Sequence, residues 1–211
     1  MESEQVTGAK EIPDIVVGRL PIYLRALQRM MEEGRRLTSS QELGERLGIS
    51  AAQIRKDLSQ FGEFGKQGTG YSIEFLAEQI LHILQVNQVW EMVVVGAGDI
   101  GSAIARYQGF ANRGFRVIKL FDSDPQKIGQ EVGPFTIHNA SELEDTIRQA
   151  GIKVAMIATP SASAQGVADR LVSAGVKAIL NYAPISLNVP EDVQVQYIDP
   201  VIHLQRMTYY L

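Results

Sequence analysis

The chain contains no cysteine, three histidines and one tryptophan. Without cysteine it has no disulfide bonds, no thiolate metal site and no cysteine nucleophile. No apolar run reaches the roughly 18 residues that a membrane-spanning helix needs. The segment 1–12 is acidic and polar, unlike a secretory signal. We therefore expect a cytoplasmic protein without a membrane anchor or a metal site, in which residues 1–12 form a disordered tail.

The chain also lacks an excess of basic residues, and its formal net charge of −4 argues at first against nucleic acid as a partner. The charge is unevenly distributed, however. Residues 13–72 carry nine lysine and arginine residues against seven acidic ones, whereas residues 73–211 carry ten against fourteen. A segment that meets a polyanion should lean basic. The asymmetry is weak, but it favours residues 13–72 as the part that would bind nucleic acid.

The first part of the chain has the apolar spacing of amphipathic helices. A first helix is expected to begin at Pro21, because proline suits a first helical turn, and to end at Gly34. A second, short helix follows, with Ser39 or Thr38 as its N-cap. Glu42 is placed to complete a capping box with Ser39.

A third helix is expected over residues 50–62. It is separated from the second by the short turn 47–49, which makes a helix-turn-helix pattern. The glycine-rich segment 62–73 is too rich in turn residues for a helix and is interpreted as a small β-hairpin, or wing. An amphipathic helix over 74–87 would act as a connector. We assign residues 13–88 to a winged-helix DNA-binding domain with its connector helix.

From Trp90 onward the sequence alternates between expected strands and helices. The strands are rich in valine and isoleucine and apolar on both faces, which is typical of a parallel sheet covered by helices. They are expected at 90–98, 115–122, 135–138, 154–160, 177–184 and 193–199. The fold class is therefore α/β, with a Rossmann-type domain over residues 89–198. The last segment, 199–211, is a helix candidate with no evident place in the sheet.

The stretch VVVGAGDIG, residues 93–101, has the spacing of a dinucleotide-binding loop between a strand and a helix. Gly96 would permit the tight turn, and Gly98 would let the backbone approach a pyrophosphate. Gly101 would let helix and strand pack closely. Asp122 ends the next strand, 21 residues after Gly101.

The chemistry of this loop suggests which nucleotide it takes. Free N–H groups near Asp99 and Ile100, at the start of the helix, would meet the negative charge of the pyrophosphate. The carboxylate of Asp99 would compete with phosphate, so we expect it to point outward. Asp122 would bind ribose hydroxyls and repel a 2′-phosphate. The loop therefore favours NAD(H) over NADP(H).

The sequence offers few candidate catalytic residues for hydride transfer. Such an enzyme normally needs a proton donor or acceptor held near the nicotinamide. His82 and His138 are more readily interpreted as structural, and the chain has no Tyr-x-x-x-Lys pair. The domains assigned above also leave no room for a substrate domain. A nucleotide site without catalytic residues suggests a sensor, with a small NAD-dependent oxidoreductase carrying a helical N-terminal extension as the alternative.

The second helix of a helix-turn-helix enters the major groove of DNA. Ile54 and Leu58, four residues apart, would face the core. Arginine or lysine can pair with guanine or bind phosphate. The same face, with its acidic Asp57, is also compatible with an ordinary solvated helix. The side chains that this helix would present to DNA are those of Gln53, Arg55, Lys56 and Ser59.

The runs IRKDLSQFGEFGKQGTGY, VVVGAGDIGSAIARYQGF and LNYAP occur in this order. Together they closely resemble the Rex family of bacterial redox-sensing transcriptional repressors, from about residue 13 to the C-terminus. The resemblance implies a winged helix-turn-helix domain followed by a Rossmann domain, in a homodimer that exchanges the dimerisation helix 199–211. It further implies a repressor that binds a palindromic operator and dissociates when NADH rises relative to NAD⁺.

Residue roles follow from the same resemblance. Lys66 in the wing would approach the minor groove, and Arg25, Tyr107 and Asp199 would form the polar switch around the nicotinamide and between domains. At Gln67 and Pro200 the chain departs from residues that are common in the family. The expected DNA-binding residues are Gln53, Arg55, Lys56, Ser59, Phe61 and Lys66. The expected nucleotide-binding residues are Gly96, Ala97, Gly98, Asp99, Ile100, Gly101, Asp122, Tyr107, Thr159 and Pro160.

Overall fold

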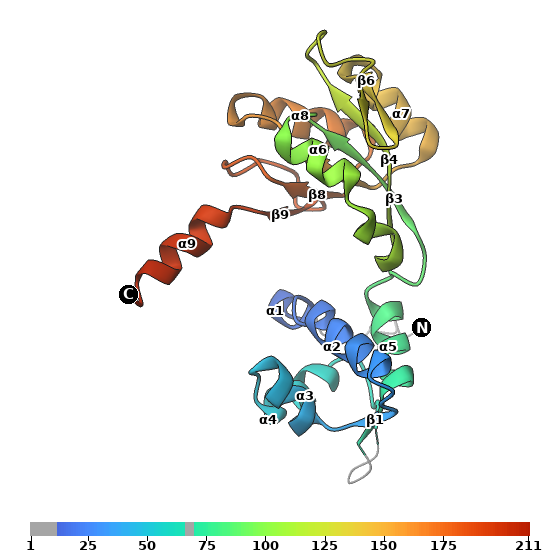
Figure 1. The fold of residues 1–211 in the computed structure, drawn as a ribbon, viewed down its shortest axis with the longest axis vertical. Helices are drawn as coiled ribbons and strands as arrows, with labels where there is room; N and C mark the ends of the chain where they lie inside the picture. Colours follow the sequence, from blue (N-terminus) through green and yellow to red (C-terminus); the bar gives the residue numbers. More distant parts are fainter. Residues whose placement is uncertain (1–11, 66–69) are drawn as a thin grey trace, which may run out of the picture. The chain divides into compact units, whose positions relative to one another are not determined.

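The computed structural model describes residues 12–65 and 70–211 and divides into two compact units, Met1–Asn87 and Gln88–Leu211. In the described residues, the first unit is mainly helical and the second contains a seven-stranded sheet (Figure 1). No helix in these ranges is long and apolar enough to cross a membrane. Lys66, Gln67 and most of the expected N-terminal tail lie outside the described residues.

The first unit packs its helices around one apolar core. Tyr23 and Leu27, Leu43, Ile54 and Ile80, which come from four different helices, are fully buried in one cluster. The described elements are α1 (Asp14–Val17), α2 (Leu20–Glu32), β1 (Leu37–Thr38), α3 (Ser40–Leu47), α4 (Ala51–Leu58), β2 (Tyr71–Ser72) and α5 (Ile73–Ile83). The helices expected in this segment are therefore present, with a short additional helix before α2.

The two helices of the helix-turn-helix pattern begin at serine caps, as the sequence predicts. The Ser39 hydroxyl accepts a hydrogen bond from the Glu42 amide at 3.1 Å, and the Ser50 hydroxyl accepts one from the Gln53 amide at 3.2 Å. Each cap satisfies one of the amides that a helix start leaves without a partner. Only half of the expected capping box is present, because the Glu42 carboxylate has other partners.

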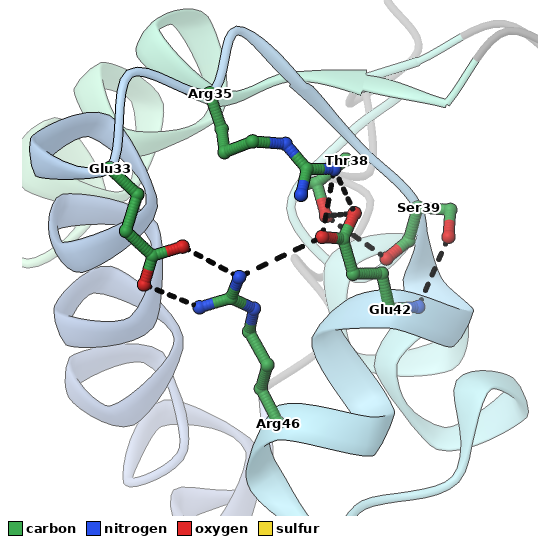
Figure 2. A network of polar contacts seen from close by, with 6 residues as sticks. All are labelled: Glu33, Arg35, Thr38, Ser39, Glu42 and Arg46. Atoms are coloured by element: carbon green, nitrogen blue, oxygen red, sulfur yellow. Dashed lines mark hydrogen bonds and ion pairs between the residues drawn. The ribbon is translucent and has the colours of Figure 1, made fainter.

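Glu42 joins a network that ties α3 to the end of α2 (Figure 2). Its carboxylate accepts hydrogen bonds from Thr38 Oγ1 and Arg35 Nη2, both at 3.1 Å, and lies 3.9 Å from Arg46. Arg46 in turn donates two hydrogen bonds, of 2.9 and 2.7 Å, to the Glu33 carboxylate. These side chains are partly exposed, so the network orients the helices more than it stabilises them.

The predicted end of the third helix was wrong. The helix ends at Leu58 instead of Gly62, and the chain then continues through tight turns in which the Phe61 amide donates to the Leu58 carbonyl. The hairpin expected over 62–73 includes residues 66–69, which lie outside the described residues, and its described strand is β2. It pairs antiparallel with β1, so that Leu37 faces Ser72. Strand β1 was not predicted, because a two-residue strand is too short to show alternation.

The second unit is a doubly wound, mainly parallel sheet. Its strand order is β5-β6-β4-β3-β7-β8-β9, and all neighbouring pairs are parallel except β5 with β6. The strands are β3 (Trp90–Val95), β4 (Phe115–Asp122), β5 (Glu131–Val132), β6 (Phe135–Asn139), β7 (Val154–Ile157), β8 (Ala178–Asn181) and β9 (Gln194–Tyr197). Every expected strand is present, and only the two-residue β5 was missed.

Helices cover both faces of this sheet. Val93 and Val95 pack with α7 (Leu143–Ala150) and α8 (Ser161–Ala174), whereas Met92 and Val94 pack with α6 (Asp99–Arg106). Successive residues of a strand point to opposite faces. This explains why β3 is apolar throughout. Because β4 lies on one side of β3 and β7 on the other, the sheet has a switch point between β3 and β7, where such folds bind ligands.

The last helix, α9 (Pro200–Thr208), has no buried residue. It lies outside the layers of the sheet (Figure 1). Its exposed apolar side chains include Val201, Ile202, Leu204 and Met207, each more than half exposed. A monomeric soluble protein rarely leaves an apolar helix face like this one exposed to water. The helix is present as expected, and it still lacks a packing partner within the described chain.

Candidate functional site

The glycine-rich loop lies at the switch point, between the end of β3 and the start of α6. Gly96 has a φ of +103°, and a Cβ atom there would lie 2.4 Å from the Ala158 carbonyl oxygen. A Cβ atom at Gly101 would lie 1.7 Å from the Gly96 carbonyl oxygen, whereas one at Gly98 would meet nothing within 4 Å. Gly96 and Gly101 are therefore required by the fold, and Gly98 leaves open space beside the loop.

The helix that follows begins without a side-chain cap. Gly98 is the N-cap of α6 and has no side chain to accept from the first amides. These amides have no acceptor within the helix and carry its positive end. Asp99 and Ile100, in the first turn, are both exposed. The loop and helix start can therefore bind an anionic group that approaches over Gly98.

Asp122, at the end of β4, braces this loop. Its carboxylate accepts hydrogen bonds from the Ala97 amide at 2.8 Å, from the Asp124 amide at 2.9 Å and from Lys127 Nζ at 3.3 Å. Burial raises the pKa of Asp122, but these three donors outweigh burial and hold the pKa below its usual range. Asp122 is thus an anion at neutral pH. The amide of Ala97 is already engaged by Asp122.

A cavity of about 890 Å³ opens beside the loop. It is lined by most of the residues expected to bind a nucleotide, namely Gly96, Gly98, Asp99, Ile100, Asp122, Thr159 and Pro160. Lys127 and Arg170 also line it. The Oγ1 atom of Thr159 is buried. Among the buried side-chain nitrogen and oxygen atoms of the described residues, it is the one without a hydrogen-bond partner. Such an atom is costly unless a ligand or water pairs with it.

Tyr107 lies apart from these residues, at the other end of α6. The helix ends at Arg106 because Tyr107 adopts an extended backbone. By the rise of a helix, Tyr107 is about 12 Å from the start of α6. Its side chain is half-exposed, stacks edge-on against Phe110 and accepts a hydrogen bond from Arg113 at 3.2 Å. It lines a separate cavity of about 460 Å³.

The exposed face of α4 carries most of the side chains expected to meet DNA. Arg55, Lys56 and Ser59 are exposed, and Ile54 and Leu58 are buried as predicted. Arg55 donates a hydrogen bond to the Ser40 hydroxyl at 2.9 Å. Together with Ser59 and Tyr71 it lines a groove of about 900 Å³.

Phe61 differs from the expectation of a DNA-facing side chain. It is only partly exposed and packs against the core of the first unit. The tight turns after α4 direct the ring inward, where its apolar surface is removed from water. Lys66, the remaining candidate, lies outside the described residues.

Asp57 is the functional-site residue that sequence reasoning missed. It appeared to be an ordinary charge on a solvated helix, but it is only 1% exposed. Its carboxylate accepts two hydrogen bonds from Arg19, at 2.5 and 2.7 Å, one from the Tyr23 hydroxyl at 2.6 Å and one from Gln53 Nε2 at 2.7 Å. The network joins α4 to the start of α2. No local pattern in the sequence signals this pairing.

The buried Asp57 makes the first unit sensitive to acid. Burial raises the pKa of Asp57, but the bonds from Arg19, Tyr23 and Gln53 outweigh burial and lower it. A carboxyl whose pKa is lower in the folded state stabilises the fold at neutral pH, and this contribution is lost as the pH falls through the folded pKa. We expect the stability of Asp57→Asn to fall less steeply with acid than that of wild type below pH ~4, because the contribution of this one carboxyl is removed. Chemical denaturation across this pH range measures it, and identical pH profiles would contradict the prediction.

The residues expected to act as a switch come from both units. Arg25 lies on α2 in the first unit, where its side chain is exposed. Asp199 and Tyr107 belong to the second unit. The Asp199 carboxylate caps α9 by accepting a hydrogen bond from the Val201 amide at 2.9 Å. One of its two oxygens remains available for a second partner.

Comparisons with known proteins agree with this two-part organisation. A family model described as a putative DNA-binding protein N-terminus matches residues 11–59, and one described as a CoA binding domain matches residues 87–185. The redox-sensing transcriptional repressor Rex of Chloroflexus aggregans is 56% identical over 199 residues, covering 94% of each chain. Its counterpart from Roseiflexus sp. is 54% identical over 202 residues, covering 96% of this chain and 92% of its own.

Solved structures show the same likeness across both units. A structure of RSP in complex with β-NAD⁺ and operator DNA has a TM-score of 0.91 and 36% identity, covering 95% of this chain and 93% of that one. A structure of RSP with β-NADH has a TM-score of 0.85 and 33% identity, covering 98% and 95%. With more than half of its residues identical to named members over nearly its whole length, the chain belongs to the Rex family of redox-sensing transcriptional repressors.

Proposed function

We propose that this chain is a transcriptional repressor that binds a palindromic operator and dissociates when NADH rises relative to NAD⁺. The observation that carries the proposal is the likeness of nearly the whole chain to RSP, which has been solved both with NAD⁺ and operator DNA and with NADH. The glycine-rich loop with its anionic Asp122 and the exposed basic face of α4 supply the two sites that such a function needs.

The operator is read by a winged helix-turn-helix in this proposal. The N-terminal part of α4 enters the major groove, where base contacts of such helices concentrate. Arg55 and Lys56 contact bases or phosphates, and Ser59 lies on the same exposed face. The β1–β2 pair belongs to the wing in this proposal, and Lys66, the expected wing residue, lies outside the described residues. The groove beside Arg55 lies between α4 and β2 and supports this arrangement.

The nucleotide is NAD(H), bound across the switch point. Its pyrophosphate lies over Gly98 at the start of α6, and its adenosine ribose meets Asp122. The unpaired Thr159 hydroxyl, next to Gly96, supplies a hydrogen bond to the bound nucleotide. Lys127 offsets part of the negative charge of Asp122. Asp122 therefore repels a 2′-phosphate less strongly than the sequence suggests.

The chain acts as a regulator and not as an enzyme in this proposal. Family membership supports this, and the positions of the histidines agree with it. His82 contacts Asn87 at 3.1 Å, His138 lies 3.4 Å from Glu142, and His203 is on α9. Among the described residues that line the 890 Å³ cavity there is no histidine. Nothing in the geometry of residues 12–65 and 70–211 favours the oxidoreductase alternative.

A homodimer completes the proposed repressor, which acts on DNA in the cytoplasm. The apolar face of α9 is exposed in the single chain. A second copy of the chain buries this face when the two copies exchange the helix. A two-fold symmetric dimer presents two copies of α4 to the two halves of a palindrome.

A DNA-binding measurement with added nucleotide tests the function. Operators are first selected by the purified chain from a randomised palindromic DNA library. We expect tight binding to a selected duplex, release by NADH, and a weaker effect of NAD⁺. Steady oxidation of NADH in the presence of small carbonyl compounds would instead support the oxidoreductase alternative. Failure to select any sequence would contradict the repressor.

The switch is proposed to act through Arg25, Asp199 and Tyr107. Asp199 pairs with Arg25 in the DNA-binding state and exchanges it for Tyr107 when the reduced nicotinamide enters. A ligand shifts an equilibrium only by its differential affinity for the two states. The two nicotinamide forms differ in charge, so the discriminating contacts should lie beside that ring.

Arg25→Ala or Asp199→Ala should therefore give a dimer that binds NADH but releases DNA much less in response. We expect the coupling between the two ligands to fall by about 1–3 kcal/mol, the usual size of an allosteric link. Operator affinity with and without saturating NADH measures it for each variant. Wild-type ratios in both would rule out this switch while leaving the repressor function intact.

A further inference from the structure

Gln53 is held at both its backbone and its side chain. It is the third residue of α4, and its backbone amide donates to the Ser50 hydroxyl at 3.2 Å. Its side-chain Nε2 donates to Asp57 Oδ1 at 2.7 Å, and the side chain is only partly exposed. The carboxamide is thus immobilised at the start of the helix that the proposed function places in the major groove.

Asp57 determines which way this carboxamide turns. An ionised carboxylate only accepts hydrogen bonds, so Nε2 must face Asp57 and Oε1 must face away from it. Asp57 is itself anchored by Arg19 and Tyr23, which makes its position rigid. The orientation of the Gln53 amide is therefore fixed by the chemistry of its partner.

The remaining groups of this amide match one base. One Nε2–H donor and the Oε1 acceptor of Gln53 have no partner in the described residues. Adenine presents an N7 acceptor and an N6 amino donor side by side in the major groove, and glutamine pairs with both. Guanine presents two acceptors, N7 and O6, so the fixed Oε1 would face O6 and repel it. We propose that Gln53, oriented by Asp57, reads one adenine in each half-site of the operator.

This inference rests on the proposed function and adds the specificity of its DNA site. Asp57 acts as a positioning residue, since it is buried and does not itself reach the base. Its effect is selective. An amide that was free to turn could present Nε2 to guanine O6, whereas the fixed amide cannot. Asp57 therefore raises the preference for adenine by penalising guanine.

The test uses the full chain and a duplex that the wild-type protein has selected from a randomised palindromic library. Each adenine of the half-site is replaced in turn by 7-deazaadenine, which lacks the N7 acceptor, or by guanine with its paired cytosine. For wild type we expect one position where guanine weakens binding by about 5- to 150-fold, the range for one bidentate base contact. Gln53→Met, which keeps the volume but removes both groups, should lose the effect at that position alone.

Asp57→Asn tests the positioning role. An asparagine amide can either donate to Oε1 or accept from Nε2 of Gln53, so the Gln53 amide becomes free to turn. We expect the preference for adenine over guanine to fall at the same position and to persist elsewhere. Tyr23→Phe is the matched control, because it removes one donor from Asp57 but leaves the bond to Gln53. Thermal unfolding and NADH binding verify that each variant is folded.

The outcomes separate this inference from the function on which it rests. If the wild-type chain selects no sequence, the proposed function fails. If it selects an operator and Gln53→Met keeps every base preference, the reading by Gln53 is overturned and the repressor stands. If Asp57→Asn keeps the preference that Gln53→Met loses, Gln53 reads the base without help from Asp57. An Asp57→Asn chain that does not fold leaves Gln53→Met to decide.

Discussion

Replacing Gly98 with alanine should weaken NADH binding and leave the protein folded. In the free chain a Cβ atom at this position meets nothing within 4 Å, and the backbone has a negative φ of −76° that alanine adopts freely. The stability cost should therefore be about 1 kcal/mol or less, the loss expected for alanine at a helix N-cap. The methyl group would occupy the space through which the pyrophosphate is proposed to approach the amides of α6.

The loss of affinity should be at least about 1–3 kcal/mol, the cost of forcing an extra methyl group into a packed contact. Because the helix proposed to read DNA belongs to the other unit, Gly98→Ala should bind the operator normally and fail to release it when NADH is added. Calorimetry with NADH and operator binding with and without NADH measure the two effects. Unchanged NADH affinity would show that the nucleotide does not approach over Gly98.

Gly101→Ala is the contrasting control. Its Cβ atom would lie 1.7 Å from the Gly96 carbonyl oxygen, so the backbone itself would have to move. We expect this variant to lose about 3 kcal/mol of stability, the upper end of overpacking effects. The two substitutions in this motif should thus impair the protein for different reasons. Gly98→Ala blocks the ligand, whereas Gly101→Ala disrupts the fold.

The second unit was predictable from sequence because its signals are local. Each strand is a short Val/Ile-rich run. Each glycine of residues 96–101 is explained by what its own position requires, namely a tight turn, space for a ligand or close packing. The double-sided burial of Met92 to Val95 explains why the runs are continuous and not alternating. What the sequence did not show was that the Ala97 amide would bond to Asp122, which depends on two strands being brought together.

The first unit was predictable in its helices but not in its polar contacts. Asp57 finds Arg19 and Tyr23, 38 and 34 residues away along the chain. Helical periodicity places Asp57 at the boundary of an exposed face, and only the fold shows that α2 covers it. The pairing of β2 with β1 was missed for the same reason, since the partner strand lies before α3.

The other large effect is expected on operator binding, when basic residues on the exposed face of α4 are substituted. Arg55→Ala and Lys56→Ala should each weaken binding to a selected operator by about 1–3 kcal/mol, and the double variant by about the sum if the two act independently. Arg55 is already oriented by its bond to Ser40, which favours a directed contact with a base or phosphate. NADH affinity should be unchanged in all three variants. Arg29→Ala, which removes an exposed arginine of α2 instead, is the matched control.

The salt dependence of binding distinguishes the two kinds of contact. If Lys56 binds a phosphate, its removal should weaken all sequences alike and reduce the slope of log affinity against log salt by about 1. A residue that reads a base should instead relax the preference at one operator position. If Arg55→Ala and Lys56→Ala both bound like Arg29→Ala at every salt concentration, α4 would not be the DNA-reading helix. The reading of adenine by Gln53 would then fall with it, whereas the effect of Gly98→Ala on NADH binding would not.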